Sequence, residues 1–235
     1  MMLHHLQTRG GLALRDLTGC SWSGPVPKDV TEIHRLARVL AADRRGAPAR
    51  AARRLTADRV PGRVLDIGAG LAPWSLAIAA ASRDVHVLAV DLPEQLAALT
   101  EAVAAADVSA QFKTMAADVF TSDLRTAAGY DLVIVANVCH LFPASRTRSL
   151  LIRAADVLAP GGVLAVIDQV LDDPPDWLQW AVLYAVGLPQ VMPGGYLHTV
   201  DEYVTWMADA GLVAGLAVPL SAPPGLSLVS ARRES

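Results

Sequence analysis

The sequence predicts an α/β fold in which parallel strands alternate with helices that cover both faces of one sheet. From residue 63 onward, short apolar runs of strand length alternate with stretches rich in alanine and leucine at helical spacing. This alternation is typical of βαβ units, which build a parallel sheet buried on both faces. Of the 235 residues, 53% are apolar, which is enough for a large core. We therefore expect one α/β domain over residues 61–235.

The expected elements follow from these patterns in chain order. The first five strands are expected at Arg63–Ile67, Val85–Val90, Gln111–Ala116, Asp131–Ala136 and Val163–Ile167. Helices are expected between them at Pro73–Ala81, Pro93–Ala106 and Ala144–Leu158. Pro160-Gly161-Gly162 is interpreted as a helix stop before the fifth strand. Two more helices and two final strands are expected at Asp176–Gly187, Val200–Ala210, Leu212–Leu220 and Leu226–Ala231.

Residues 1–60 have a different character from the rest of the chain. They contain no convincing strand, arginine is abundant, and Asp29–Leu55 has the pattern of one or two helices. The sequence therefore predicts a helical N-terminal segment over residues 1–60, followed by the α/β domain.

Composition and charge exclude several classes of partner. The formal net charge of −3 offers no broad attraction to nucleic acid or to an anionic membrane. No apolar run reaches the roughly 18 residues that a membrane helix needs, and no cationic segment followed by an apolar run opens the chain. Two cysteines are too few for a disulfide framework or a zinc cluster. We expect a cytoplasmic protein with no metal, no membrane and no nucleic-acid partner.

The stretch Arg-Val-Leu-Asp-Ile-Gly-Ala-Gly at residues 63–70 carries the most chemistry. Gly68 and Gly70 have no Cβ and allow a ligand to approach the backbone closely. Asp66 precedes this turn, where a carboxylate suits a ligand that bears a cation rather than a pyrophosphate. A dinucleotide fingerprint would require a third glycine where Pro73 stands. The combination points to S-adenosylmethionine, and an ordinary strand-to-helix turn is the alternative.

Two further acids follow the second and third strands. Asp91 is expected to accept hydrogen bonds from both ribose hydroxyls, with an N-cap for the helix at Pro93 as the alternative. Asp118, beside Val119 and Phe120, is expected to accept an adenine amino proton, with a turn-starting aspartate as the alternative. Three acids at the ends of three successive strands would line one crevice at the carboxyl edge of the sheet.

The fourth strand leads into Asn137-Val-Cys-His140. A histidine at this edge would look toward the group that lies beside the cofactor's methyl. Its neutral imidazole could deprotonate a phenol or an enol as it attacks. A capping or core histidine is the alternative at this position.

Together these motifs resemble the class I S-adenosylmethionine-dependent methyltransferases, and within them the caffeate/hydroxyindole O-methyltransferase family, including its bacterial natural-product members. The resemblance spans roughly residues 30–231. It is carried by Val-Leu-Asp-Ile-Gly-Ala-Gly (64–70), Val-Asp-Leu-Pro (90–93), Ala-Asp-Val-Phe (117–120), Asn-Val-Cys-His (137–140), Leu-Ala-Pro-Gly-Gly-Val-Leu (158–164) and Thr-Val-Asp-Glu-Tyr…Ala-Gly-Leu (199–212).

The resemblance implies a Rossmann-like, seven-stranded, doubly wound sheet with an antiparallel last strand. It implies His140 as the general base, S-adenosylhomocysteine as the product and no metal. The implied cofactor contacts are Asp66, Gly68, Gly70, Asp91, Leu92, Asp118, Val119 and Asn137. The implied walls of the substrate pocket are Trp177, Trp180, Tyr184 and Met192, although aromatic residues at helical spacing are also typical of plain core.

The chain departs from the family at several positions. Leu141-Phe142 replaces the usual Asp-Trp after the histidine, and Leu197-His198 replaces the acid and arginine that commonly support the base. The expectation is therefore a base without an orienting carboxylate. Trp74 stands in a usually glycine-rich continuation and is expected either to shape the methionine end of the cofactor or to pack under the helix. The family's winged-helix dimerisation domain is longer than residues 1–60. Either this segment is a lid or a reduced dimerisation region, or the chain starts late, so a homodimer stays open.

The leading hypothesis is methyl transfer to an oxygen of a small aromatic or polyketide-like acceptor. Methylation at carbon or nitrogen stays open. A second hypothesis is a family member that retains the cofactor for decarboxylation, hydroxylation or pericyclic chemistry, which the unsupported base would favour. A third is a binding subunit without turnover.

Overall fold

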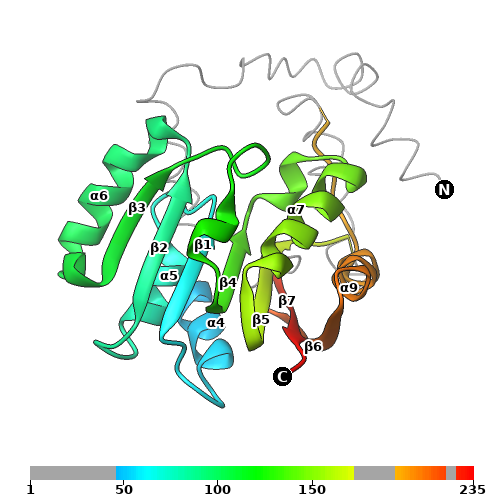
Figure 1. Cartoon of the computed structure of the whole chain (residues 1–235), viewed down its shortest axis with the longest axis horizontal. Coiled ribbons are helices and arrows are strands. Elements are labelled where there is room, and N and C mark those ends of the chain that lie inside the picture. Colours follow the sequence, from blue (N-terminus) through cyan, green and yellow to red (C-terminus); the bar gives the residue numbers. More distant parts are fainter. Residues whose placement is uncertain (1–45, 172–193, 221–225) are drawn as a thin grey trace.

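The computed structural model describes residues 46–171, 194–220 and 226–235, and these form a seven-stranded sheet in the order β3-β2-β1-β4-β5-β7-β6 (Figure 1). Neighbouring strands from β1 to β5 pair in parallel, and β7 runs antiparallel to both β5 and β6. The predicted α/β class, the doubly wound sheet and the antiparallel last strand are confirmed. The strands are Arg63–Ile67 (β1), His86–Asp91 (β2), Phe112–Ala116 (β3), Tyr130–Ala136 (β4), Leu158–Gln169 (β5), Leu212–Pro219 (β6) and Leu226–Arg233 (β7).

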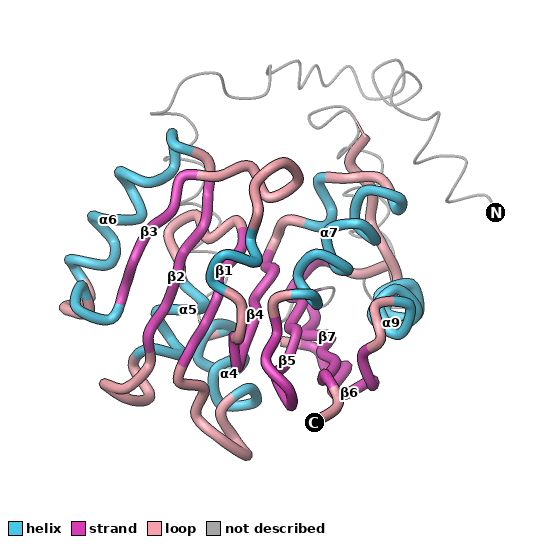
Figure 2. The backbone as a smooth tube through the Cα atoms, in the orientation of Figure 1, coloured by secondary structure: helices cyan, strands magenta, loops and turns pink. Residues whose placement is uncertain are grey.

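Helices cover both faces of this sheet, as Figure 2 shows. The longer helices are Ala47–Leu55 (α4), Pro73–Ala79 (α5), Leu96–Ala105 (α6), Ala144–Asp156 (α7) and Val200–Asp209 (α9). Among the described residues, short 3₁₀ turns lie at Pro93–Gln95 (η1), Ser109–Gln111 (η2), Leu124–Ala127 (η3) and Cys139–Leu141 (η4).

Two apolar clusters fill the space between the sheet and its helices. On one face, the buried side chains of α7 and α9 pack against Leu65, Ile67 and Val133. On the other face, α4, α5 and α6 pack against Val64 and Ile134. Successive strand residues therefore point to opposite layers, as the period of a strand requires when both faces are buried.

The fifth strand differs from its prediction. Pro160-Gly161-Gly162 does not separate α7 from the strand, because β5 already begins at Leu158. The register between β4 and β5 shifts between Tyr130 and Leu132 at this point. A Cβ on Gly162 would lie 2.6 Å from the Tyr130 carbonyl oxygen, so the glycine serves close backbone packing between two strands rather than a helix stop.

Two predicted segments lie largely or wholly outside the described residues. These are the helix expected at Asp176–Gly187 and residues 1–45 of the N-terminal segment. Within that segment α4 is observed, and it ends at the predicted Leu55. Among the described residues, no helix combines the length and the apolar character needed to cross a bilayer.

The strand order reverses direction between β1 and β4, because the chain moves from β1 outward to β3 and then returns to the other side of β1. Ligands of open α/β sheets bind at such a switch point, beyond the carboxyl ends of the strands. The loops after β1, β2, β3 and β4 all begin at this edge. The candidate site is therefore built there.

Candidate active site

The turn after β1 is shaped by two glycines that do different things. Gly68 has a φ of +67°, and a Cβ on it would lie 2.4 Å from Cγ2 of Val138. Its N–H donates to the Val90 carbonyl at 2.8 Å, which ties the turn to the end of β2. Gly70 has a φ of +55°, but no described atom lies within 4 Å of a Cβ placed on it. The turn is thus packed tightly at Gly68 and open at Gly70.

Asp66 is a buried carboxyl whose hydrogen bonding is only half satisfied. It is 1% exposed, and its Oδ2 accepts a hydrogen bond from the Ser75 hydroxyl at 2.5 Å. Within the described part of the chain its Oδ1 has no hydrogen-bond partner. Burial raises the pKa of Asp66 to about 7, with the Ser75 hydrogen bond opposing this and the Asp91 charge adding to it. A cationic group beside Oδ1 would relieve both the missing hydrogen bond and the buried charge.

Asp91, at the end of β2, joins the same turn. Its Oδ2 accepts the Gly70 N–H and its Oδ1 accepts the Leu92 N–H, each at 2.7 Å. Burial raises the pKa of Asp91, although these two backbone hydrogen bonds oppose it. The η1 turn that starts at Pro93 receives no side-chain cap, so the N-cap alternative is not observed. The carboxylate instead faces the glycine turn.

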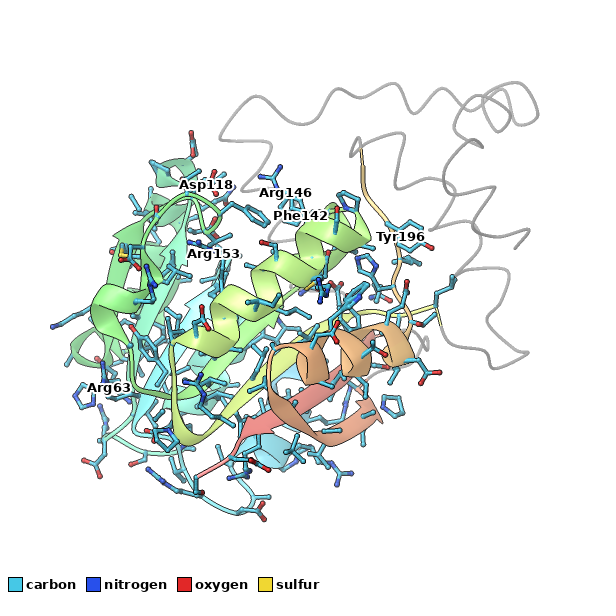
Figure 3. The ribbon with its side chains drawn as sticks, turned by 45° about the vertical axis from the view of Figure 1, so that its right-hand side comes forward. Arg63, Asp118, Phe142, Arg146, Arg153 and Tyr196 are labelled. Atoms are coloured by element: carbon cyan, nitrogen blue, oxygen red, sulfur yellow. The ribbon has the colours of Figure 1, made fainter. Side chains whose placement is uncertain are left out.

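Asp118, after β3, forms a local turn. Its Oδ1 accepts the Phe120 N–H at 2.8 Å, and its carbonyl accepts the N–H groups of Thr121 and Ser122 at 3.2 and 2.9 Å. The turn-starting role is therefore observed, and the exposed carboxylate remains at the same sheet edge (Figure 3). The adenine contact stays a prediction.

Asn137, after β4, holds an unusual backbone conformation, with a φ of +57°. Its side-chain Oδ1 is buried without a hydrogen-bond partner among the described residues. A left-handed, unsatisfied polar residue at a crevice is typical of a ligand-facing position.

His140 is supported by a carboxylate, which corrects the expectation of an unassisted base. Asp168, at the end of β5, places its Oδ1 2.5 Å from the His140 Nδ1, and its Oδ2 accepts the His140 backbone N–H at 3.0 Å. The Gln169 N–H also donates to this carboxylate at 2.8 Å. Leu197, where the family acid was expected, is buried in the core. The orienting acid therefore comes from β5 and not from the segment before α9.

The charge of Asp168 is stabilised despite its complete burial. Burial alone would raise the pKa of its carboxyl, but the His140 side chain and the His140 and Gln169 amides outweigh burial and hold that pKa below its usual value. An ionised carboxylate can only accept at Nδ1. The Nδ1 of His140 therefore carries a proton, and Nε2 is the ring nitrogen that would act as the base.

A second histidine lies beneath the turn that carries His140. His198 is fully buried, and its Nε2 lies 3.1 Å from the Thr147 hydroxyl and 3.3 Å from the Cys139 carbonyl. Thr147 also donates to the Cys139 carbonyl at 3.1 Å. Burial lowers the pKa of His198, so it is neutral and holds η4 as a hydrogen-bond donor. The sequence pointed only to a departure from the family at this position.

The remaining predicted residues fall in three groups. Leu92 is 50% exposed at the site edge, and Val119 is partly buried in the neighbouring loop. Trp74 is 4% exposed and packs in the core under α5, which decides between its two alternatives. The four predicted pocket residues, Trp177, Trp180, Tyr184 and Met192, lie outside the described residues.

Two residues of this site were missed at the level of sequence, Asp168 and Ser75. Asp168 follows a predicted strand just as Asp66, Asp91 and Asp118 end or follow theirs, and that position was the available signal. Ser75 lies in the first turn of α5 with no distinguishing pattern, so no signal was available.

Comparisons with known proteins show that the chain is similar to methyltransferases. A family model described as a methyltransferase domain matches residues 64–162. The chain is 27% identical over 168 residues to 3-hydroxy-5-methyl-1-naphthoate 3-O-methyltransferase of Streptomyces sahachiroi, covering 72% of this chain and 48% of that protein. It is 28% identical over 138 residues to the tetracenomycin polyketide synthesis 8-O-methyl transferase TcmO of Streptomyces glaucescens, covering 59% and 40%. The chain thus spans half or less of the length of these relatives.

A solved structure has a similar fold. Human N-acetylserotonin methyltransferase, in complex with S-adenosylmethionine, superposes with a TM-score of 0.73 at 20% identity, covering 96% of this chain and 66% of that one.

Proposed function

We propose that the chain transfers a methyl group from S-adenosylmethionine to an oxygen of a small aromatic or polyketide-like acceptor, because a methyltransferase-domain model matches residues 64–162 and the chain is similar to bacterial O-methyltransferases. The observation that carries the proposal is the His140–Asp168 pair at the same sheet edge as the half-satisfied carboxyl of Asp66. His140 is oriented by Asp168 to accept a proton, and Asp66 has a buried oxygen that can pair with a cation.

The residues at the edge fit the cofactor on three counts. Asp66 offers the methionine ammonium a buried oxygen that lacks a partner. Gly70 leaves open space beside its backbone. Asp91 offers the ribose hydroxyls a carboxylate that two amides already hold in place. Asp118, Val119, Leu92 and Asn137 complete the proposed set of cofactor contacts.

The chemistry divides between the cofactor and the chain. When bound, S-adenosylmethionine supplies a methyl group activated by its sulfonium. The acceptor hydroxyl would give its proton to Nε2 of His140, and the resulting imidazolium would keep its Nδ1–H on Asp168. The ionised Asp168 stabilises that cation, so proton transfer becomes easier as the oxygen attacks. General-base help of this kind contributes roughly a hundredfold or more to the rate.

The supported base also bears on the competing hypotheses. The hypothesis of non-methylating chemistry depended on the expectation that His140 lacks an orienting carboxylate. Because Asp168 supplies that carboxylate, the structure no longer favours this hypothesis. An aromatic acceptor is favoured by the names of the two bacterial relatives, which refer to a naphthoate and a tetracenomycin polyketide. Trp177, Trp180, Tyr184 and Met192 are proposed to line the acceptor pocket.

Calorimetric titration and a product assay test the proposal together. The protein should bind S-adenosylmethionine and S-adenosylhomocysteine with measurable heat. Incubation with S-adenosylmethionine and a panel of phenols, naphthols and hydroxylated polyketides should yield S-adenosylhomocysteine and products heavier by one methylene. No heat from folded protein would overturn cofactor binding. A changed acceptor without S-adenosylhomocysteine would overturn methyl transfer.

A further inference from the structure

The loop after β3, residues 118–122, accepts hydrogen bonds from an arginine side chain of helix α7. We call this segment the β3 loop. The Arg153 Nε donates to the Val119 carbonyl at 2.8 Å, and its Nη2 donates to the Ser122 carbonyl. Arg153 lies near the end of α7, more than thirty residues away in sequence. The Arg153 guanidinium therefore donates hydrogen bonds to two backbone carbonyls, one on each side of the loop tip.

A second arginine of α7 contacts the same loop two turns earlier. The Arg146 guanidinium carbon lies 4.1 Å from the centroid of the Phe120 ring and 5.1 Å from that of Phe142. The two rings meet edge to face, with centroids 4.9 Å apart. Figure 3 places Phe142 and Arg146 side by side near Asp118, with Arg153 farther along α7. The helix thus holds the β3 loop against the turn that carries His140.

Besides the arginine contacts, the side chains of Val119 and Phe120 pack, partly buried, against the apolar core. The hydrogen bonds inside it all run to Asp118, so they shape a local turn without attaching it to the sheet. β3 is an edge strand and pairs only with β2. A cavity of about 310 Å³, lined by residues 121–125, Arg153 and Asp156, lies against the loop. On that side of the loop, the Arg153 side chain is therefore one of the contacts that hold it.

We propose that Arg153 is a positioning residue for the cofactor, because it fixes the β3 loop so that Asp118 and Val119 meet the adenine end. This inference rests on the proposed function, which assigns those two residues to adenine. A planar guanidinium presents two donors in a fixed fork and can satisfy both carbonyls at once. A lysine has a single nitrogen and would hold one of them well.

The test compares three variants on the same helix. Arg153→Met removes both donors at similar length, and Arg153→Lys keeps one charged group. Arg148→Met is the matched control, because Arg148 pairs with Asp209 at 2.9 Å and does not contact the loop. Affinity for S-adenosylhomocysteine is measured by calorimetry. Amide hydrogen exchange of residues 118–122 is measured on the protein without cofactor.

We expect Arg153→Met to weaken S-adenosylhomocysteine binding on the order of tenfold, Arg153→Lys by less, and Arg148→Met not at all. Exchange in the β3 loop should quicken in Arg153→Met while the amides of α7 keep their protection. Turnover at saturating cofactor should stay near that of the unaltered protein, so that KM for the cofactor changes and kcat does not.

Unchanged affinity together with unchanged loop exchange in both Arg153 variants would overturn the inference. Lost protection throughout α7 would also overturn it, since that outcome describes a general structural role. If the unaltered protein gives no heat with S-adenosylhomocysteine, the proposed function fails. The exchange experiment then still decides whether Arg153 holds the loop.

Discussion

His140 and Asp168 are joined twice, since the two oxygens of one buried carboxylate accept the side-chain Nδ1–H and the backbone N–H of the same histidine. The double contact restrains both the ring and the peptide that carries it. It arises because β4 and β5 are adjacent and parallel, so the end of β5 lies beside the turn that follows β4. Orientation of the base is therefore a property of the sheet rather than of a flexible loop.

Replacement of Asp168 by asparagine should lower kcat roughly a hundredfold, the scale of general-base help. The amide keeps the shape but loses the charge, and its NH₂ can pair with the wrong tautomer of His140. Steady-state turnover at saturating substrates is the measurement, with circular dichroism as the check on folding. In the double variant with His140→Ala, the two losses should not add, because both remove the same base. Fully additive losses would separate Asp168 from His140.

Replacement of Asp91 by alanine should weaken cofactor affinity by about 1–3 kcal/mol, the range for hydrogen bonds to a charged group. The variant loses the proposed ribose acceptor and also frees the Gly70 N–H that Asp91 now holds. Asp84→Ala is the control, because Asp84 is exposed and lies just before the start of β2, at the opposite end of the strand from Asp91. Calorimetry with S-adenosylhomocysteine measures both. Equal affinities in the two variants would remove Asp91 from the site.

Most of the fold could be predicted because its signals are local in sequence. β1 was predicted to the residue, since Arg63 opens the apolar run and the glycine turn ends it. The start of β5 was wrong because Pro160-Gly161-Gly162 usually ends a helix. Glycine is necessary at Gly162 because the Tyr130 carbonyl of another strand lies close to it. The sequence around Gly162 contains no signal of that contact.

The same reasoning separates the predictable and unpredictable parts of the site. Asp66, Asp91 and Asp118 could be predicted as a set because each lies at or just after the carboxyl end of its own strand. The partner of His140 could not, since Asp168 is 28 residues away and their contact depends on the register of β4 against β5. The family pattern directed attention to position 197, where the chain has a core leucine.

Replacement of Asp66 by asparagine should stabilise the cofactor-free protein at alkaline pH. The carboxyl has a pKa of about 7 in the fold against an ordinary 3.8, so between these values the folded state binds more protons than the unfolded one. Stability conferred by the protonated form is lost as pH rises through this window and stays lost above it. Asparagine, which never ionises, avoids that cost of up to a few kcal/mol.

Urea unfolding of both proteins near pH 8 and near pH 4 measures this effect. The advantage of the variant should be largest at the higher pH and should shrink toward the lower one. With added S-adenosylmethionine, the unaltered protein should become the more stable of the two. The ligand's ammonium would compensate the charge of Asp66, whereas the asparagine amide offers it no opposite charge. A variant less stable than the unaltered protein near pH 8 would contradict the buried, uncompensated carboxylate.

Replacement by alanine should mainly lower the stability of the fold at Gly68 and mainly lower cofactor affinity at Gly70. Both glycines have positive φ, so each alanine costs about 1 kcal/mol in backbone strain. At Gly68 the new methyl also meets Cγ2 of Val138, so Gly68→Ala should unfold at clearly lower urea, and Val138→Ala should restore part of the loss. At Gly70 the methyl enters open space, so stability should fall only by the strain while affinity for S-adenosylhomocysteine drops sharply. Unfolding curves and calorimetry distinguish the two, and a Gly70→Ala variant with full affinity would show that the cofactor does not occupy that space.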